Sequence, residues 1–229
     1  MKDLILKQKV KEAPKTWSFI WSPVNQFEWE PGQFLVYHMD LKNSDGRGTE
    51  RYFTIASAPS EGDVMLTTRF FDDGSSFKDQ LFSMEEGQKI KASGPSGEFV
   101  LDDYSRSYVF IAGGVGITPY RSILVDLFES GRDVNIELFY GNGSQDFVYK
   151  NTLDNLEKRI KGLEINYITS PNKINEDHIR EAEQKMDEPL FFVSGPASMV
   201  DSLGETIIDL GIEKNRIRHD HFPGYSWGW

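Results

Sequence analysis

The sequence of 229 residues contains no cysteine. This absence excludes disulfide bonds, zinc sites with thiolate ligands, iron–sulfur clusters held by cysteine and a cysteine nucleophile. Any iron–sulfur centre that exchanges electrons with this chain therefore has to belong to another protein.

Basic residues are scarce as well. The sequence has 25 Lys and Arg against 36 Asp and Glu, which gives a formal net charge of -11. Because nucleic-acid backbones are bound through Lys and Arg, this excess of negative charge argues against a nucleic-acid partner.

Long apolar runs are also missing, since no stretch approaches the roughly 18 residues that a membrane-spanning helix needs. The first residues, Met1–Lys7, are not followed by a long apolar stretch with a small-residue cleavage site. We therefore expect a cytoplasmic protein with no membrane span.

Short apolar runs separated by turn residues are present up to about residue 100. These runs are Leu4–Val10, Thr16–Trp21, Phe34–Met39, Tyr52–Ala56, Val64–Phe71 and Lys89–Ala92. Such spacing is typical of an antiparallel β-barrel or sandwich. One short helix is expected at Ser76–Phe82, where a serine can cap its N-terminus.

The pattern changes after Asp103. Short apolar runs now alternate with amphipathic stretches, which predicts a parallel sheet with helices on both faces. Strands are expected at Tyr108–Ala112, Ile136–Tyr140, Glu164–Thr169 and Leu190–Val193, and helices at Tyr120–Ser130, Thr152–Lys161 and Ala197–Leu210. We therefore predict two domains, residues 1–103 and residues 104–229.

The segment Arg51–Ser57 combines an arginine, aromatic rings and hydroxyl groups on one predicted strand. Along a strand Tyr52 and Thr54 share one face, while Arg51 and Phe53 share the other. An aromatic ring beside a hydroxyl suits a flat ring system, and an arginine offers a forked donor for a pyrophosphate. An ordinary strand with one surface arginine explains the same residues.

The segment Val109–Pro119 joins an apolar strand to a glycine-rich turn. Pro119 suits the first turn of a helix, and the free N–H groups of that turn favour a phosphate. A purely structural turn is the alternative. The segment Phe191–Met199 repeats the pattern with Gly195-Pro196, and two such strand ends in one parallel sheet can flank one crevice.

Taken in order, five short motifs resemble the ferredoxin–NADP reductase superfamily over nearly the whole chain. They are Pro31-Gly32-Gln33-Phe34, Arg51-x-Phe53-Thr54-x-x-Ser57, Gly94-Pro95-x-Gly97-x-Phe99, Gly113-Gly114-x-Gly116-Ile117-Thr118-Pro119 and Gly195-Pro196-x-x-Met199. Ser76-Phe77-Lys78 and the ending Arg216–Tyr225 look like the small stand-alone FAD-dependent NAD(P)H oxidoreductases of this superfamily.

The resemblance implies an N-terminal antiparallel β-barrel that binds a flavin and a C-terminal α/β parallel-sheet domain that binds a nicotinamide dinucleotide. It implies FAD, in preference to FMN, with NADH or NADPH as substrate. The residues implied for flavin binding are Arg51, Tyr52, Phe53, Thr54, Ser57, Thr67, Thr68, Arg69, Ser75, Ser76 and Phe77. Those implied for the dinucleotide are Gly114, Gly116, Thr118, Pro119, Gly195, Pro196 and Met199.

The resemblance also implies roles for single residues. Arg51 is expected on the flavin pyrophosphate, Tyr52 against the flavin ring system and Thr54 near the flavin N5 atom. Ser194 stands where many relatives have a cysteine beside the nicotinamide. Phe222 matches the family's Asp/Glu-x-Phe ending, in which an aromatic ring covers the flavin. We take Thr54, Ser194 and Phe222 as candidate catalytic residues, and the alternative lids are Tyr225, Trp227 and Trp229.

Two further segments bear on ligands. Thr169–Lys173 contains one cation, Lys173, where NADP-specific relatives have arginines for the 2′-phosphate, so NADH is favoured. His219 and His221 lie two residues apart, as a metal pair does, but no carboxylate or thiol at suitable spacing completes a site. An exposed tail is preferred there, and no metal is expected.

These features predict hydride transfer from NAD(P)H to bound FAD, followed by electron transfer to a separate acceptor. The acceptor is expected to be a soluble redox protein such as ferredoxin or flavodoxin, or a small electron acceptor. Two alternatives stay open, a free-flavin reductase and a non-catalytic electron-transfer subunit of a larger complex.

Overall fold

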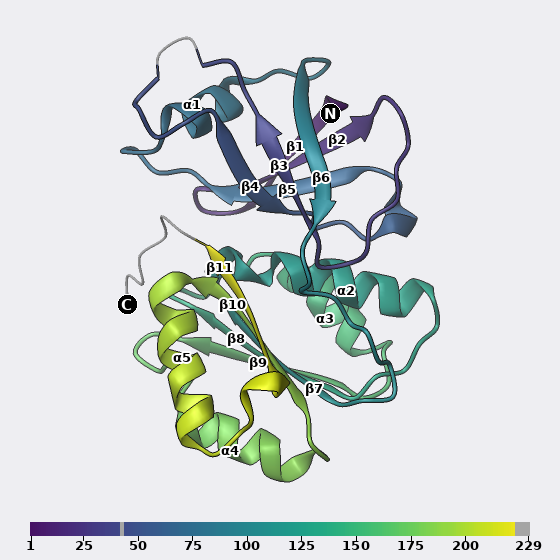
Figure 1. Ribbon diagram of the computed structural model, residues 1–229, viewed down its shortest axis with the longest axis vertical. Coiled ribbons are helices and arrows are strands. Elements are labelled where there is room, and N and C mark those ends of the chain that lie inside the picture. The colour runs from purple at the N-terminus through teal and green to yellow at the C-terminus, as the bar shows by residue number, and fades with distance from the viewer. Residues whose placement is uncertain (42–43, 223–229) are drawn as a thin grey trace. The chain divides into compact units, whose positions relative to one another are not determined.

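The computed structural model describes residues 1–41 and 44–222. The chain divides into two compact units, Met1–Val100 and Leu101–Trp229 (Figure 1).

The first unit is an antiparallel β-structure. Its strands are β1 (Lys2–Ala13), β2 (Thr16–Pro23), β3 (Phe34–His38), β4 (Glu50–Thr54), β5 (Val64–Arg69) and β6 (Lys89–Ser96). They form one sheet in the order β4-β3-β6-β1-β2-β5, and every pairing is antiparallel. The predicted antiparallel architecture is confirmed, and β4 lies at an edge of the sheet. The unit also contains η1 (Pro59–Glu61) and α1 (Ser76–Ser83).

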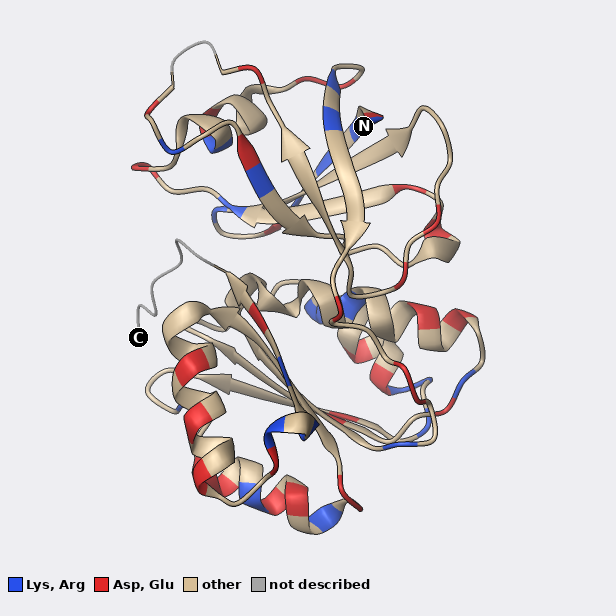
Figure 2. Ribbon diagram, viewed as in Figure 1, with Lys and Arg blue, Asp and Glu red and all other residues tan. Residues whose placement is uncertain are grey.

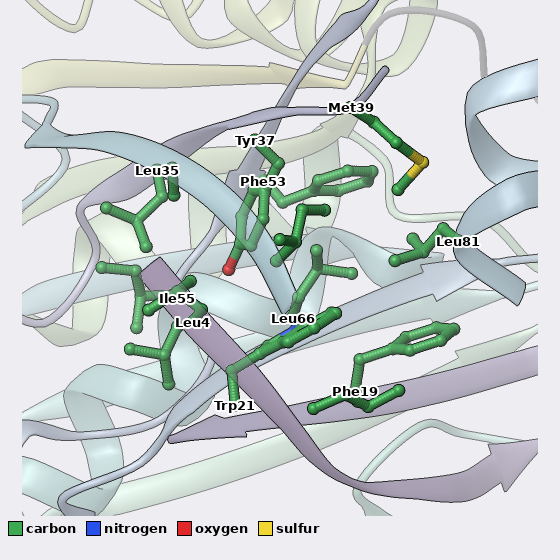
Figure 3. Packing of buried hydrophobic residues seen from close by; sticks show 14 of the residues in the cluster. Leu4, Phe19, Trp21, Leu35, Tyr37, Met39, Phe53, Ile55, Leu66 and Leu81 are labelled. Carbon is green, nitrogen blue, oxygen red and sulfur yellow. The ribbon is translucent and has the colours of Figure 1, made fainter. Parts of the chain in front are cut away.

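Aromatic rings fill the core of this unit (Figure 3). Phe19, Trp21 and Tyr37 are fully buried, and the ring centroids of Trp21 and Tyr37 lie 6.4 Å apart. Phe77 and Leu81 of α1 are also fully buried, because residues four apart share one face of a helix. Burying each large side chain contributes roughly 1.5–3 kcal/mol. The position of α1 is therefore set by its apolar side, which leaves its N-terminus beside β4 and β5.

The second unit contains a parallel sheet. Its strands are β7 (Tyr108–Gly113), β8 (Ile136–Asn142), β9 (Leu163–Thr169), β10 (Leu190–Pro196) and β11 (Ile217–Phe222). Their order is β11-β10-β7-β8-β9, and every pairing is parallel. All six residues of β7 are buried, as expected for a sheet covered on both faces. The predicted α/β architecture is confirmed.

Helices cover both faces of this sheet (Figure 1). They are α2 (Thr118–Glu129), α3 (Lys150–Glu157), α4 (Glu176–Lys185) and α5 (Ala197–Asp209), together with η2 (Gly114–Ile117) and η3 (Lys214–Arg216). Asp201, Glu205 and Asp209 recur every four residues along α5 and make its outer face acidic (Figure 2). Among the residues with described positions, no helix is long and apolar enough to cross a membrane.

Two elements of the second unit differ from the sequence-based expectation. The helix α4 is absent from that expectation, and His219 and His221, although exposed as expected, do not belong to a tail. Both histidines lie on β11, which pairs with β10. Arg216 holds the start of this strand, because its guanidinium donates to both carboxylate oxygens of Glu183 at 3.0 and 2.8 Å and to the Pro189 carbonyl.

Tyr120 offers a test of how the centre of the parallel sheet is held. Its buried hydroxyl lies 3.0 Å from the Ile111 carbonyl oxygen of β7 and 2.7 Å from the Phe192 carbonyl oxygen of β10. Tyr120→Phe removes this donor, so we expect the free energy of unfolding to fall by about 1–3 kcal/mol. Urea unfolding followed by circular dichroism measures the change. The matched control, Tyr104→Phe at a partly exposed ring, should stay within about 0.5 kcal/mol, and equal effects of both substitutions would contradict the prediction.

Candidate functional site

The two faces of β4 hold different side chains. Arg51 and Phe53 lie on the side of α1: the Arg51 guanidinium carbon is 5.4 Å from the centre of the Phe77 ring, and the Phe53 and Phe77 centroids are 6.3 Å apart. Tyr52 packs on Phe34 instead, with centroids 5.6 Å apart, and is 67% exposed. The structure thus brings Arg51, Phe53 and Phe77 together and places Tyr52 on the other face.

The residues that follow on β4 and its loop are buried. Thr54 pairs with Phe34 of β3 in the sheet. The Ser57 hydroxyl accepts a hydrogen bond from the Met65 amide at 3.0 Å, and the Ser57 carbonyl accepts one from the Trp29 indole at 3.2 Å. Ser57 therefore joins the loop after β4 to β5 in the described structure.

On β5, the three candidate residues differ in exposure. The Thr67 hydroxyl lies 2.7 Å from the Ser18 hydroxyl, and both side chains are buried. Thr68 is fully buried, whereas Arg69 is exposed, with its guanidinium carbon 5.8 Å from the centre of the Phe71 ring. Of these three, Arg69 has the side chain that reaches solvent.

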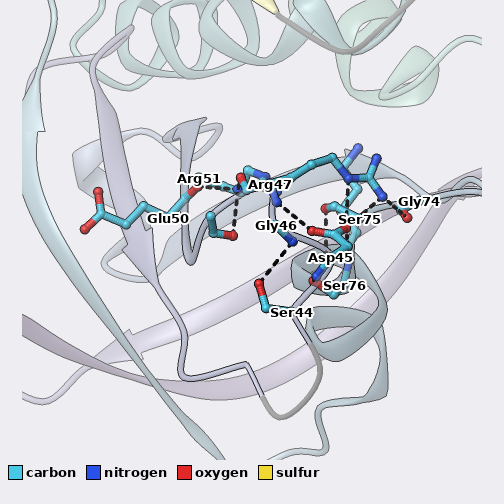
Figure 4. A network of polar contacts seen from close by, with 11 residues as sticks. Ser44, Asp45, Gly46, Arg47, Glu50, Arg51, Gly74, Ser75 and Ser76 are labelled. Carbon is cyan, nitrogen blue, oxygen red and sulfur yellow. Dashed lines mark hydrogen bonds and ion pairs between the residues drawn. The ribbon is translucent and has the colours of Figure 1, made fainter.

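The N-terminus of α1 is capped from within the chain. The Ser75 hydroxyl accepts a hydrogen bond from the Lys78 amide at 3.3 Å, which makes Ser75 the N-cap. The Ser76 amide donates to the Asp45 carboxylate at 2.8 Å (Figure 4). Arg47 binds the same carboxylate through its side-chain Nε at 2.8 Å. Sequence reasoning missed Asp45, although Asp45-Gly46 is a turn dipeptide shortly before Arg51.

Charge at this helix end is paired within the chain. Hydrogen bonds from the Ser76 and Arg47 backbone amides hold the pKa of Asp45 well below its usual range. The Arg51 guanidinium donates to the carbonyl oxygens of Arg47 at 3.0 Å and Glu50 at 2.6 Å. An ionised carboxylate and two guanidinium groups therefore lie beside the first turn of α1.

In the second unit, glycines shape the turn between β7 and α2. Gly114 has φ +54, and a Cβ built there meets nothing within 4 Å. A Cβ on Gly116 would instead overlap the Ser194 carbonyl at the end of β10. The turn therefore leaves its backbone open at Gly114 and packs directly on β10 at Gly116.

The start of α2 completes this turn. The Thr118 hydroxyl donates to the Val115 carbonyl at 3.0 Å, and Pro119 lies in the first turn of the helix. Proline is tolerated there because the N–H group that it lacks has no partner inside the helix. A helix N-terminus that follows an open glycine backbone is suited to binding a phosphate.

At the end of β10, Gly195 and Pro196 lead into α5. Met199 is buried, and its thioether fills the space that a side chain on Gly113 would need. The structure therefore places Met199 beneath the glycine turn, as a packing contact of Gly113 and Gly195.

Ser194 and Asp220 form a polar pair where β10 and β11 meet. They are register partners, and the buried Ser194 hydroxyl donates to the Asp220 carboxylate at 3.3 Å. Burial raises the pKa of Asp220 to about 6, although the Ser194 hydrogen bond and the charge of His221 act in the opposite direction. This carboxyl group therefore keeps its proton to a higher pH than an exposed aspartate does.

Phe222 is the register partner of Pro196 at the end of β11 and is half-buried. The alternative lids Tyr225, Trp227 and Trp229 lie outside the described residues. His221 is 3.0 Å from an Asp201 carboxylate oxygen. Within residues 1–41 and 44–222, no group of three or more His, Cys, Asp or Glu side chains is arranged to hold a metal ion.

The carboxyl ends of β8 and β9 are linked by their loops. The Gln145 side-chain amide donates to the Thr169 hydroxyl at 2.9 Å. In the same loop as Gln145, the Ser144 hydroxyl donates to the Asp146 carboxylate at 3.0 Å. The loop after β8 thus carries the Asp146 carboxylate, and the loop after β9 carries Lys173, in the segment expected to meet a 2′-phosphate.

Comparison with known proteins identifies two domains. Residues 3–101 match the oxidoreductase FAD-binding domain family, and residues 110–204 match the oxidoreductase NAD-binding domain family. The stachydrine N-demethylase reductase subunit Stc4 of Rhizobium meliloti (strain 1021) is 25% identical over 237 residues. That alignment covers 95% of this chain and 66% of the relative, so this chain spans less than two thirds of the relative's length.

Solved structures share the fold. The cytochrome P450 reductase GcoB of Amycolatopsis superposes with a TM-score of 0.83 at 19% identity, over 96% of this chain and 69% of that chain. The ferredoxin-NADP+ reductase of Plasmodium falciparum superposes with a TM-score of 0.80 at 16% identity, over 96% of this chain and 95% of that chain. The chain therefore carries an FAD-binding and an NAD-binding oxidoreductase domain, and it shares the fold of the ferredoxin-NADP+ reductase of Plasmodium falciparum.

Proposed function

We propose that this protein oxidises NADH or NADPH and passes the electrons through bound FAD to a separate acceptor, which is a soluble redox protein or a small molecule. The observation that supports this most is the presence of both matched domains in one chain. A relative named as a reductase subunit and a structural neighbour named as a cytochrome P450 reductase support a separate acceptor.

The residues at the two helix starts suit the phosphates of FAD and of a nicotinamide dinucleotide. The open backbone at Gly114 and the start of α2 suit the phosphates of a dinucleotide, and Arg51 beside the start of α1 suits those of a flavin. FAD, when bound, accepts two electrons from the nicotinamide and releases them one at a time. The protein has to bind and orient these groups and exclude water.

On the flavin side, we propose that the cofactor lies along the free edge of β4. Residues of both faces can reach a ligand at the edge of a sheet, so Tyr52 and Thr54 can contact it from one face and Arg51 and Phe53 from the other. Ser75, Ser76 and Phe77 are proposed to present the backbone N–H groups of the first turn of α1 to the flavin phosphates. The remaining candidates for this site are Ser57, Thr67, Thr68 and Arg69.

On the dinucleotide side, we propose that Gly114, Gly116 and the start of α2 hold the phosphates, with Thr118 and Pro119 shaping that turn. Ser194, Gly195 and Pro196 are proposed to lie beside the nicotinamide. The ring of Phe222 is proposed to cover the flavin. Met199 packs against this turn, because its thioether lies beside Gly113.

A free-flavin reductase, in which the flavin is a released substrate, is the second candidate. The specific observation in its favour is the Asp45 carboxylate on the Ser76 amide, which occupies a donor proposed for the flavin phosphates. Retention of the yellow colour through desalting distinguishes a tightly bound cofactor from a released one.

One prediction concerns Arg51. A charge-assisted hydrogen bond to a pyrophosphate contributes about 1.5–3 kcal/mol, so Arg51→Ala should weaken FAD binding about tenfold to a hundredfold. Titration of the apoprotein with FAD measures the loss, and circular dichroism checks that the fold is retained. Arg180→Ala removes an exposed guanidinium of α4 as a matched control. Wild-type FAD affinity in the Arg51 variant would overturn the assignment.

Another prediction concerns the electron donor. Lys173 is the one cation of the Thr169–Lys173 segment, so kcat/KM should be similar for the two donors or favour NADH. Steady-state kinetics with each donor and an artificial acceptor give the ratio. A preference for NADPH above roughly a hundredfold, about 2.7 kcal/mol, would show that another cation binds the 2′-phosphate.

A further prediction concerns Asp220, whose pKa of about 6 lies above the roughly 3.9 of an exposed aspartate. Between these values the folded protein holds a proton that the unfolded chain has released, so stability falls as the pH rises through this window. Asp220→Asn should therefore raise the free energy of unfolding by about 1–3 kcal/mol at pH 8 and change it little at pH 4.

Urea unfolding at both pH values measures this difference. Asp209→Asn, on the exposed face of α5, is the matched control and should show no such pH dependence. An Asp220→Asn effect of the same size at both pH values would contradict the prediction.

A further inference from the structure

The segment between β3 and β4 places a carboxylate on the first turn of α1. Both oxygens of Asp45 are used: Oδ1 accepts from the Arg47 amide at 2.9 Å, and Oδ2 accepts from the Ser76 amide at 2.8 Å. The Ser76 hydroxyl in turn accepts from the Asp45 amide at 3.3 Å. Asp45 and Ser76 are therefore joined by two hydrogen bonds, although 31 residues separate them in the sequence.

Arg47 strengthens this arrangement (Figure 4). Its guanidinium binds Asp45 Oδ2 through Nε at 2.8 Å and through a terminal nitrogen at 2.7 Å. That terminal nitrogen also donates to the Gly74 carbonyl at 2.6 Å, just before α1. The carboxylate is thus held on the helix end from two sides, by Ser76 and by Arg47.

Two glycines allow the segment to adopt this shape. Gly46 has φ +79 and Gly48 has φ +84, a backbone conformation that residues with side chains rarely adopt. A Cβ at either position would meet nothing within 4 Å, so the requirement concerns the backbone conformation and not space. With this backbone conformation, the side chains of Asp45 and Arg47 reach Ser76 and Gly74 at the start of α1.

The same donors are those proposed for the flavin phosphates. A backbone amide has one proton, so the Ser76 N–H cannot bind a carboxylate and a phosphate oxygen fully at once. An ionised carboxylate also repels a phosphate at contact distance. Arg51 lies beside this end of the helix, with its guanidinium over Phe77.

We propose that Asp45 is an internal anion that competes with the phosphates of FAD for the first turn of α1. FAD then binds fully only when the segment Ser44–Gly48 releases Ser76. This inference rests on the proposed flavin function and adds to it: the affinity for FAD is set by a competing carboxylate of the protein itself, which keeps the flavin exchangeable.

The competition depends on the phosphates of the ligand. FAD carries a pyrophosphate, whereas riboflavin has the same ring system and no phosphate. Removing Asp45 should therefore strengthen FAD binding and leave riboflavin binding unchanged. If Asp45 instead served to hold Arg47 in place for the pyrophosphate, its removal would weaken FAD binding.

The experiment is a fluorescence titration of the apoprotein with FAD and, separately, with riboflavin. Asp45→Ala should lower the dissociation constant for FAD about tenfold, because both the charge and the acceptor are lost. Asp45→Asn keeps an acceptor for Ser76 without the charge, so it should give an intermediate gain and serves as a second variant if the alanine variant does not fold. Asp73→Asn removes an exposed charge from the loop before α1 and should change FAD affinity less than twofold.

The outcomes separate this inference from the proposed function. Wild-type protein that binds FAD, with both Asp45 variants equal or weaker, would overturn the competition alone. Stronger binding of FAD and riboflavin to the same degree would also overturn it, because the phosphates would then play no part. Failure of the wild type and of both Asp45 variants to bind either flavin would overturn the proposed function together with this inference.

Discussion

The first N–H groups of a helix have no carbonyl partner within that helix. Both units of this protein place such a helix start beside residues proposed to bind phosphate, but they satisfy the N–H groups differently. In α1 the Ser75 hydroxyl accepts from one amide and the Asp45 carboxylate from another. At the start of α2, the Thr118 amide already donates to the Val115 carbonyl of η2, and Pro119 has no N–H group. The anion at α1 is therefore supplied by the chain, whereas the turn before α2 presents open backbone at Gly114.

Close backbone packing determines the second unit. Gly116 has to be glycine because any Cβ would overlap the Ser194 carbonyl, whereas a Cβ on Gly113 would require the Met199 thioether to move. The Tyr120 hydroxyl contacts carbonyl groups of both β7 and β10, so α2 and the two central strands are held together at this point. As a result, the glycine turn and the end of β10, far apart in sequence, lie against each other.

Much of the fold could be predicted from hydrophobic pattern and turn residues, because β7, β8 and β10 are buried almost throughout and read as apolar runs. The strand β11 could not, since it is an edge strand whose polar sequence hides its pairing with β10. The helix α4 was missed for a related reason: Ile179 is the one large apolar side chain of Glu176–Lys185, so the segment looks like a charged connection. Both elements depend on neighbours that local sequence does not reveal.

The candidate site shows the same limit. The two-residue period of a strand is enough to assign Tyr52 and Arg51 to opposite faces of β4, and their contacts with Phe34 and Phe77 agree with that assignment. Asp45 escapes such reasoning, because a charged residue in a glycine-containing loop has no periodicity, and its contact with Ser76 arises only when α1 packs against the sheet. The contact between Ser194 and Asp220 likewise needs the pairing of β10 with β11.

A competing carboxylate also connects the two candidate functions. The apparent affinity for a ligand falls in proportion to the fraction of protein that is able to bind it. If the conformation in which Asp45 binds Ser76 is favoured about tenfold over the released one, the affinity for FAD falls about tenfold. A bound-flavin reductase and a free-flavin reductase then differ in the position of one equilibrium and need no different set of catalytic residues. Gly46 and Gly48 set the backbone shape of the segment Ser44–Gly48, and Asp45 and Arg47 supply its charges. The equilibrium can therefore shift through changes in this segment, without any change in the residues proposed to contact the flavin ring.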